Sequence, residues 1–218
     1  MKKYEITSNT KEFAGRKLFQ IRALKDFDDV KAGDLGGYIE KEENLSHDGN
    51  AWVSGNARVS GNARVFGNAQ VYGNAWIHNL AQVCGNAQIY GDAWICGDAL
   101  IYGNTQVYGN AYVYDNARIC GYTWIYGHTR IHDSAIICSN AWVCSNSDYI
   151  CFKGFGSENR NTTMFKTKNG DICVCCGCFE GSLKEFEEKV KDTHGNTKYA
   201  KEYLACIEVA KIHFGTDE

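Results

Sequence analysis

The residues best suited to chemistry in this chain are its 11 cysteines and six histidines. The densest cysteine group is residues 173–178 (CVCCGC), which has the composition of a metal motif. Side chains alternate along a strand, so Cys173 and Cys175 face one side while Cys176 and Cys178 face the other. Four sulfurs then converge only if the chain turns between them, and no second CxxC pair follows at normal spacing. We expect free thiols, no bound metal and no other cofactor, with zinc at this cluster as the alternative.

Composition narrows the classes of protein that this chain can be. The 218 residues carry 23 Lys and Arg against 26 Asp and Glu, a formal net charge of −3. This balance argues against sequence-independent nucleic-acid binding, which needs a basic excess. No apolar run reaches the roughly 18 residues of a membrane span, and no secretory signal follows the N-terminus. We therefore expect a folded cytoplasmic protein without a membrane partner, whose cysteines remain thiols.

One repeat organises the middle of the chain. Residues 50–147 repeat every six residues without an insertion, as in residues 62–67 (NARVFG). Every sixth residue from Val53 to Val143 is Val or Ile, and the residue two positions earlier is Ala or Thr. Period-2 alternation puts both residues on the inward face of a short strand. Gly and Asn between the strands tolerate positive φ, so each hexad is expected to end at a sharp corner.

The hexad resembles the bacterial transferase hexapeptide repeat. This resemblance implies a mainly β fold, a left-handed parallel β-helix with three hexads, 18 residues, in each coil and about five coils in all. Residues 34–40 (DLGGYIE), the hexads that follow, and residues 177–183 (GCFEGSL) together resemble hexapeptide-repeat proteins encoded by bacteriophages and prophages. That likeness implies phage origin and a bacterial cytoplasm, but no reaction.

The enzymes of this repeat set a test for the histidines. Acyltransferases of the family carry a catalytic His in or beside an insertion loop, and this solenoid has no insertion. Its four histidines are His47, His78, His128 and His132. His78 and His132 share a column but lie three coils, about 14 Å, apart, too far to act on one substrate atom. A zinc carbonic anhydrase of the hexapeptide type needs three converging histidines, and at most two could converge here. We expect no catalytic residue, with acyl transfer as the main enzymatic alternative.

The N-terminal residues 1–45 are expected to form a β cap on the solenoid. Residues 17–24 alternate like a strand, and the acidic residues 26–29 are typical of a turn. Ile39 and Leu45 fall on the Ala register when it is extended backwards, so they are expected to begin a degenerate first coil. Residues 46–147 then form the solenoid itself.

The C-terminal residues 148–218 are expected to form a small α+β module of β-β-β-α-α order. The three strands lie at residues 149–152, 164–167 and 172–175, and an Asn-Gly hairpin signal joins the last two. Ser182 and Glu185 form a capping box that opens the first helix.

Outward residues 18 apart stack in columns, and two of the columns are largely aromatic. One contains Tyr72, Tyr90, Tyr108 and Tyr126, and the next, round the following corner, contains Arg58, Trp76, Trp94, Tyr112 and Arg130. Stacking of like rings between coils is the structural explanation of these columns. Aromatic surface of this extent also marks binding sites. We therefore interpret the nine residues as a candidate binding or oligomer surface, formed where the two columns meet at one edge.

These expectations favour a non-catalytic, oligomeric binding protein of phage origin. A homotrimer is favoured because related hexapeptide proteins pack three prisms side by side. The further partner would be a host protein, for example one of host defence that the chain inhibits, or a small planar nucleotide-like ligand held between aromatic rings and Arg. A hexapeptide-type acyltransferase and a purely structural scaffold are the alternatives. The patterns name neither the partner nor the role of the C-terminal module.

Overall fold

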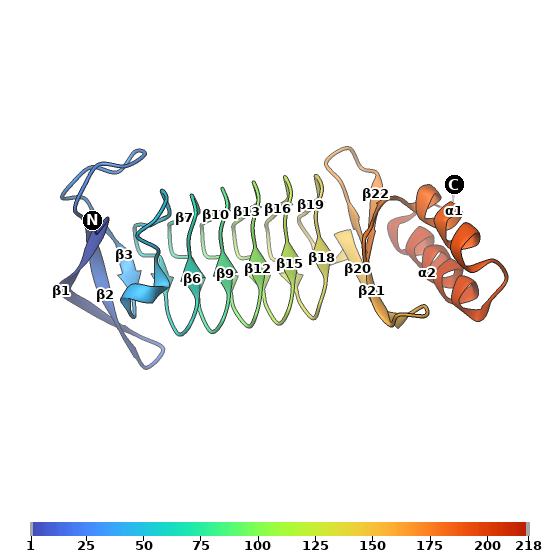
Figure 1. Cartoon of the computed structure of the whole chain (residues 1–218), viewed down its shortest axis with the longest axis horizontal. Helices are drawn as coiled ribbons and strands as arrows, with labels where there is room; N and C mark the ends of the chain where they lie inside the picture. The colour runs from blue at the N-terminus through green and yellow to red at the C-terminus, as the bar shows by residue number, and fades with distance from the viewer. Residues whose placement is uncertain (1, 217–218) are drawn as a thin grey trace.

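Each hexad forms one two-residue strand, and the strands stack into a parallel solenoid that makes up the middle of the molecule (Figure 1). Strands 18 residues apart pair in register, as Trp94 does with Trp76 and with Tyr112. Three sheets result, with the orders β3-β5-β8-β11-β14-β17, β19-β16-β13-β10-β7-β4 and β18-β15-β12-β9-β6, the first extended by β1 and β2. The expected three hexads per coil are therefore confirmed. The computed structural model describes residues 2–216.

The strands of the solenoid are β4 (Trp52–Val53), β5 (Arg58–Val59), β6 (Arg64–Val65), β7 (Gln70–Val71), β8 (Trp76–Ile77), β9 (Gln82–Val83), β10 (Gln88–Ile89), β11 (Trp94–Ile95), β12 (Leu100–Ile101), β13 (Gln106–Val107), β14 (Tyr112–Val113), β15 (Arg118–Ile119), β16 (Trp124–Ile125), β17 (Arg130–Ile131), β18 (Ile136–Ile137) and β19 (Trp142–Val143).

Burial and corner geometry explain why the hexad takes this shape. The inward Val and Ile side chains and nearly all the inward Ala side chains are fully buried. Where Thr105 and Thr123 replace Ala, each hydroxyl donates to the carbonyl oxygen three residues earlier, at 2.7 and 2.5 Å. Every corner has a residue with positive φ, such as Gly91 at 68°. A Cβ on Gly91 would also lie 2.9 Å from the backbone nitrogen of Gly109 in the next coil, so glycine suits both the conformation and the stacking.

The first coil departs from the expected register. Ile39 pairs with Val59 and Leu45 bridges Val65, so both lie in the Val/Ile column and not in the Ala column. The prediction of an Ala register was wrong because residues 46–50 add two residues to the 18-residue spacing before the repeat begins. With this coil included, the solenoid has about six turns, one more than expected.

The N-terminal cap is an antiparallel hairpin followed by a short strand that joins the solenoid. The hairpin consists of β1 (Tyr4–Phe13) and β2 (Arg16–Ala23), and β3 (Leu35–Ile39) pairs with β2 on one side and β5 on the other. The strand expected at residues 17–24 is β2, whereas β1 was not expected. A 3-10 turn, η1 (Glu42–Asn44), leads into the first coil.

The C-terminal module closes the other end of the solenoid (Figure 1). It begins after a 3-10 turn, η2 (Asn146–Asp148), with an antiparallel sheet of β20 (Tyr149–Phe155), β21 (Arg160–Lys166), β22 (Ile172–Cys176) and β23 (Phe179–Ser182). The helices are α1 (Leu183–His194) and α2 (Lys198–Phe214). The capping box of Ser182 and Glu185 is present as predicted, while β23 is a fourth strand that the sequence did not indicate.

This sheet joins two cores. Phe165, Cys173 and Cys175 on one face pack with the end of the solenoid, and Val174 and Cys176 on the other face pack with α1 and α2. The sheet therefore links the helices to the last coil. No helix within residues 2–216 is long and apolar enough to cross a membrane.

Candidate ligand-binding site

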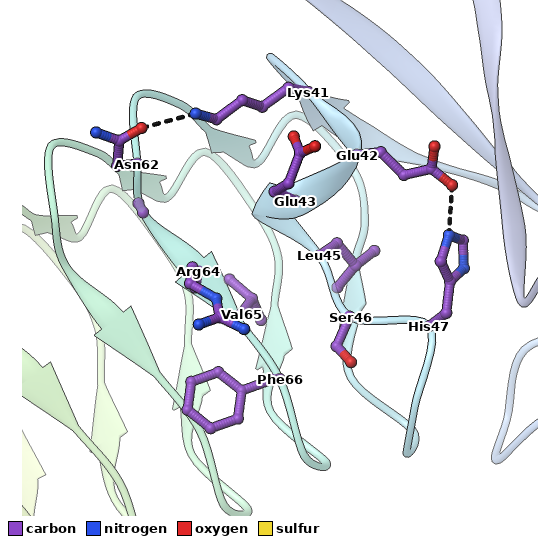
Figure 2. Close-up of a pocket in the computed structure, with 11 residues that line it drawn as sticks. Lys41, Glu42, Glu43, Leu45, Ser46, His47, Asn62, Arg64, Val65 and Phe66 are labelled. Carbon is purple, nitrogen blue, oxygen red and sulfur yellow. Dashed lines mark hydrogen bonds and ion pairs between the residues drawn. The ribbon is translucent and has the colours of Figure 1, made fainter.

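The most voluminous of the described hollows lies at the N-terminal end of the solenoid and was not expected from the sequence (Figure 2). It encloses about 530 Å³ where η1 meets β6. Its charged groups are largely paired with one another: Lys41 Nζ donates to Asn62 Oδ1 at 2.7 Å, and His47 Nε2 lies 2.7 Å from Glu42 Oε1. Because these charges are already compensated, the hollow offers little to a charged ligand.

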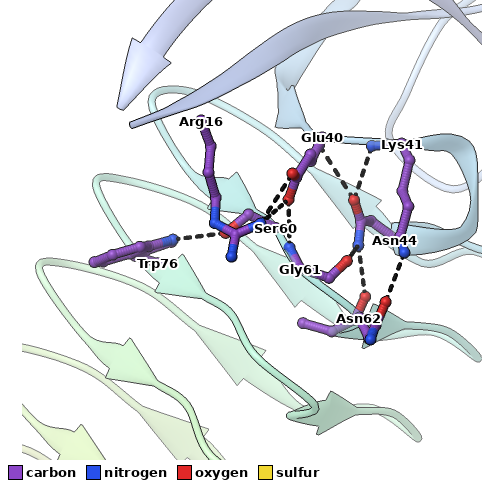
Figure 3. A network of polar contacts seen from close by, with 9 residues as sticks. Arg16, Glu40, Lys41, Asn44, Ser60, Gly61, Asn62 and Trp76 are labelled. Carbon is purple, nitrogen blue, oxygen red and sulfur yellow. Dashed lines mark hydrogen bonds and ion pairs between the residues drawn. The ribbon is translucent and has the colours of Figure 1, made fainter. Parts of the chain in front are cut away.

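A polar network beside this hollow fastens the cap to the first coils (Figure 3). Arg16 Nη1 donates to both carboxylate oxygens of Glu40 at 2.9 Å, and Glu40 accepts from Gly61 N at 2.5 Å. The buried Asn44 accepts from the backbone nitrogens of Glu40 and Lys41 and donates to the carbonyl oxygens of Gly61 and Ala63. These contacts are structural and hold the β1–β2 hairpin in place.

That hairpin covers one end of the predicted Trp column. The Phe13 ring lies 4.8 Å from the Trp76 ring, edge to face, and 3.8 Å from the guanidinium carbon of Arg58. Trp76 Nε1 donates to Ser60 Oγ at 3.1 Å (Figure 3). The interpretation of Arg58 and Trp76 as open binding surface is therefore corrected: the chain itself covers them. Phe13 lies far from the repeat in sequence, so the periodicity alone could not reveal this contact.

The rest of the Trp column lines an open hollow of about 510 Å³. Trp94 is 43% exposed, and its ring is perpendicular to that of Tyr112, with the centres 5.9 Å apart. Arg130 lies one coil further on, and the corner residues Asp92, Asn110 and His128 complete the lining. Three of the nine predicted residues, Trp94, Tyr112 and Arg130, thus come together around one concavity.

Tyr112 is fixed within this hollow by its neighbours. Its ring stacks on Tyr114 with the centres 4.5 Å apart, and the Cys96 thiol lies 3.4 Å from its hydroxyl. The contact with Cys96, together with burial, raises the pKa of Tyr112 to about 12. The phenol therefore stays neutral at physiological pH and serves as a hydrogen-bonding group, not as an anion.

Arg130 supplies the positive charge of the hollow. Its backbone is held from both sides, because its N–H donates to Asn146 Oδ1 and its carbonyl accepts from Tyr149 Oη, each at 2.7 Å. Within residues 2–216 its guanidinium has no ion-pair partner. It also lines a second hollow of about 430 Å³ with His132 and Asp133. An uncompensated cation on a fixed backbone suits an anionic ligand.

The tyrosine column, in contrast, is satisfied within itself. The rings of Tyr72, Tyr90, Tyr108 and Tyr126 stack with centres 4.8, 4.7 and 5.1 Å apart and with planes at 5° or less. Tyr90 Oη donates to Gln106 Oε1, and burial raises the pKa of Tyr90 to about 12. These half-buried rings stabilise successive coils, as the structural explanation of the column predicts.

The two columns flank the same corners but do not form one edge. The Tyr column leans over the β7–β10–β13–β16 face, where Tyr126 contacts Trp142. The Trp column leans over the β8–β11–β14–β17 face, where Trp76 stacks on His78. Within the described residues, no ring contact joins the two columns. The prediction of a single shared aromatic surface was wrong because each column turns toward its own face.

The other histidines do not assemble a catalytic group. His78 is partly buried on Trp76, and burial lowers its pKa, which favours the neutral ring. His132 contacts Tyr114 and Asp133, and His47 stacks on Tyr4. Only His128, at a corner, lines the hollow of Trp94, Tyr112 and Arg130.

The cysteine cluster divides as predicted, but one of its members has an unexpected partner. Cys173 and Cys175 face the solenoid, whereas Cys176 faces the helices. The sulfur of Cys175 is in bonding contact with that of Cys138, after β18. The expectation that all thiols are unpaired was therefore wrong for this pair, because the two residues are 37 apart in sequence and meet only when the C-terminal sheet docks on the last coil. Nine cysteines are free.

Comparisons with known proteins match the repeat. The family described as the YdcK beta solenoid repeat matches residues 51–67, 57–73, 93–109 and 105–121. The protein named "Uncharacterized acetyltransferase YdcK" from Escherichia coli (strain K12) is 39% identical over 61 residues, which cover 24% of this chain and 19% of that protein. The match thus spans about a fifth of the length of that relative. The chain is similar to YdcK-type β-solenoid repeats over part of its solenoid, including the strands that carry Trp94 and Tyr112.

Proposed function

We propose that this chain is a non-catalytic binding protein that holds a planar, anionic, nucleotide-like ligand in the hollow of Trp94, Tyr112 and Arg130. The observation that carries the proposal is the exposed Trp94 ring and the unpaired Arg130 guanidinium in one concavity of about 510 Å³. A volume of this order fits a small organic ligand. Trp94 would stack on the planar group, and Arg130 would bind the phosphate.

Calorimetric titration tests this proposal with nucleoside mono-, di- and triphosphates and cyclic dinucleotides. We expect Trp94→Ala to weaken binding by roughly 5- to 150-fold, the value of about 1 to 3 kcal/mol for one stacked base. Arg130→Ala removes a charge-assisted bond and should cost a similar factor. Tyr102→Ala and Arg118→Ala are matched controls, because both residues are exposed on another sheet of the solenoid. If no compound in the panel binds, or if the controls weaken binding equally, the proposal fails.

Self-association, with a trimer favoured, is part of the proposal, and the hollow stays open to its ligand in the oligomer. Light scattering after size exclusion should report the same oligomer for wild type and for Trp94→Glu with Tyr112→Glu. Conversion of this double variant to monomer would mean that the hollow is a subunit seam. Phage origin, a cytoplasmic location and the inhibition of a host defence protein belong to the same proposal.

Acyl transfer is the second candidate function. Two observations favour it: the similar Escherichia coli protein is named as an acetyltransferase, and His128 lies in the same hollow as Arg130. A corner histidine of this kind could act as a general base toward a substrate hydroxyl or amine. Turnover of acetyl-CoA with a panel of sugar and amine acceptors, lost in His128→Ala, would establish this function and displace the binding proposal.

A further inference from the structure

The junction between the solenoid and the C-terminal sheet gathers two sulfurs and a carboxylate. Cys138 follows β18, Cys175 lies in β22, and Glu180 lies opposite Cys175 in the antiparallel register of β22 with β23. The two cysteines are buried and Glu180 is exposed. One ligand atom from each of the three residues lies within 4.8 Å of the other two.

The contacts around these groups favour a cation. Cys138 Sγ lies 3.5 Å from Glu180 Oε2, and the Ser139 hydroxyl donates to Glu180 Oε1. Within residues 2–216, no Lys, Arg or His forms an ion pair with Glu180. A carboxylate directed at two sulfurs without a positive partner adds nothing to a disulfide, whereas it would be the third ligand of a metal ion.

The backbone separation points the same way. The Cα atoms of Cys138 and Cys175 are 7.6 Å apart, beyond the usual range of about 4.4 to 6.8 Å for a disulfide. A metal ion between two thiolates, with Zn–S bonds of about 2.3 Å each, spans a longer distance. Soft sulfur ligands with one carboxylate select zinc over magnesium or calcium.

We propose that Cys138, Cys175 and Glu180 bind one zinc-type divalent ion that tethers the C-terminal module to the last coil. Binding replaces the sulfur–sulfur contact without oxidation: the ion displaces one proton from each of two thiols, and no electron is transferred. The exposed side of Glu180 provides the route by which the ion enters. This site differs from the cluster considered in the sequence, because only Cys175 of residues 173–178 takes part.

The test uses the full chain, purified under reducing conditions, stripped with a chelator and titrated with zinc. We expect one zinc per chain by elemental analysis and two protons released per zinc. Cobalt in place of zinc should give a thiolate-to-metal absorption band in the near ultraviolet. Cys138→Ser and Cys175→Ser should each abolish high-affinity binding, and Glu180→Gln should weaken it at least about tenfold.

Two controls and a second variant keep the result decisive. Cys120→Ser removes a thiol from the same column one coil earlier, and Cys178→Ser removes one from the 173–178 segment; neither should change zinc uptake. Glu180 is exposed, so Glu180→Gln remains informative if the cysteine variants do not fold. The proposal is overturned if the folded, reduced protein takes up no zinc, or if Cys138→Ser still binds one ion with unchanged affinity. Denatured protein whose mass is two hydrogens short, together with no zinc uptake after reduction, would identify a disulfide only.

Discussion

The substitution Ile95→Asp tests whether the inward column carries the stability of the solenoid. Ile95 lies in β11, in the middle of the solenoid, where it is fully buried between Ile77 and Val113 of the neighbouring coils. Loss of the buried side chain costs about 1.5 to 3 kcal/mol, and an unpaired buried carboxylate adds about 3 to 5 kcal/mol. The sum of roughly 4 to 8 kcal/mol is comparable with the whole stability of an ordinary domain. We therefore expect Ile95→Asp to be largely unfolded or insoluble.

Urea unfolding followed by circular dichroism measures this effect against two controls. Gln88→Asp puts the same carboxylate on the exposed side of β10, beside the neutral Gln70 and Gln106, and should change the unfolding free energy by about 0.5 kcal/mol or less. Ile95→Val removes one methylene and should cost about 0.5 to 1.5 kcal/mol, which remains measurable if Ile95→Asp does not fold. A soluble Ile95→Asp protein with an unchanged unfolding midpoint would refute the assigned register.

Three further predictions concern the two ends of the solenoid. Burial alone would raise the pKa of Asp148, but hydrogen bonds from Cys144, Lys166 and Ser145 lower it to about 2 from 3.8. Its contribution of about 2 kcal/mol is therefore complete above pH 3.8 and lost as pH falls through 2, and acid titrations of unfolding should show this loss in wild type but not in Asp148→Asn. Asn44→Leu leaves several buried backbone groups of the cap without partners, so urea unfolding should show a cost of roughly 2 to 4 kcal/mol, and a cost below 0.5 kcal/mol would contradict the network. Phe13→Ala should uncover Trp76 and increase iodide quenching of tryptophan fluorescence; unchanged quenching would mean that Phe13 does not cover it.

The solenoid was predictable because each hexad repeats one local rule. Val or Ile and Ala at alternate positions specify an inward face, and a residue tolerant of positive φ specifies the corner, so every unit supports the same fold. The capping box of Ser182 and Glu185 is equally local, and it too was correct. The register of Ile39 and Leu45 was not predictable, because the additional residues before the repeat follow no period.

The candidate site was predictable only as a list of residues. The 18-residue spacing placed Trp94, Tyr112 and Arg130 in one column, but it could not reveal that Phe13 covers Arg58 and Trp76. That contact depends on how the β1–β2 hairpin folds back on the solenoid.

The meeting of Cys138 with Cys175 likewise depends on how the C-terminal sheet docks. Contacts between parts of the chain with different local rules leave no periodic signal in the sequence.

The central claim is that the hollow of Trp94, Tyr112 and Arg130 binds a planar anion. A crystal structure of the chain with the nucleotide that binds most tightly tests it most directly. We predict density for the base against the Trp94 ring and for a phosphate within hydrogen-bond distance of the Arg130 guanidinium. A hollow without ligand density, or a nucleotide bound instead in the N-terminal hollow between Lys41 and Phe66, would contradict the account.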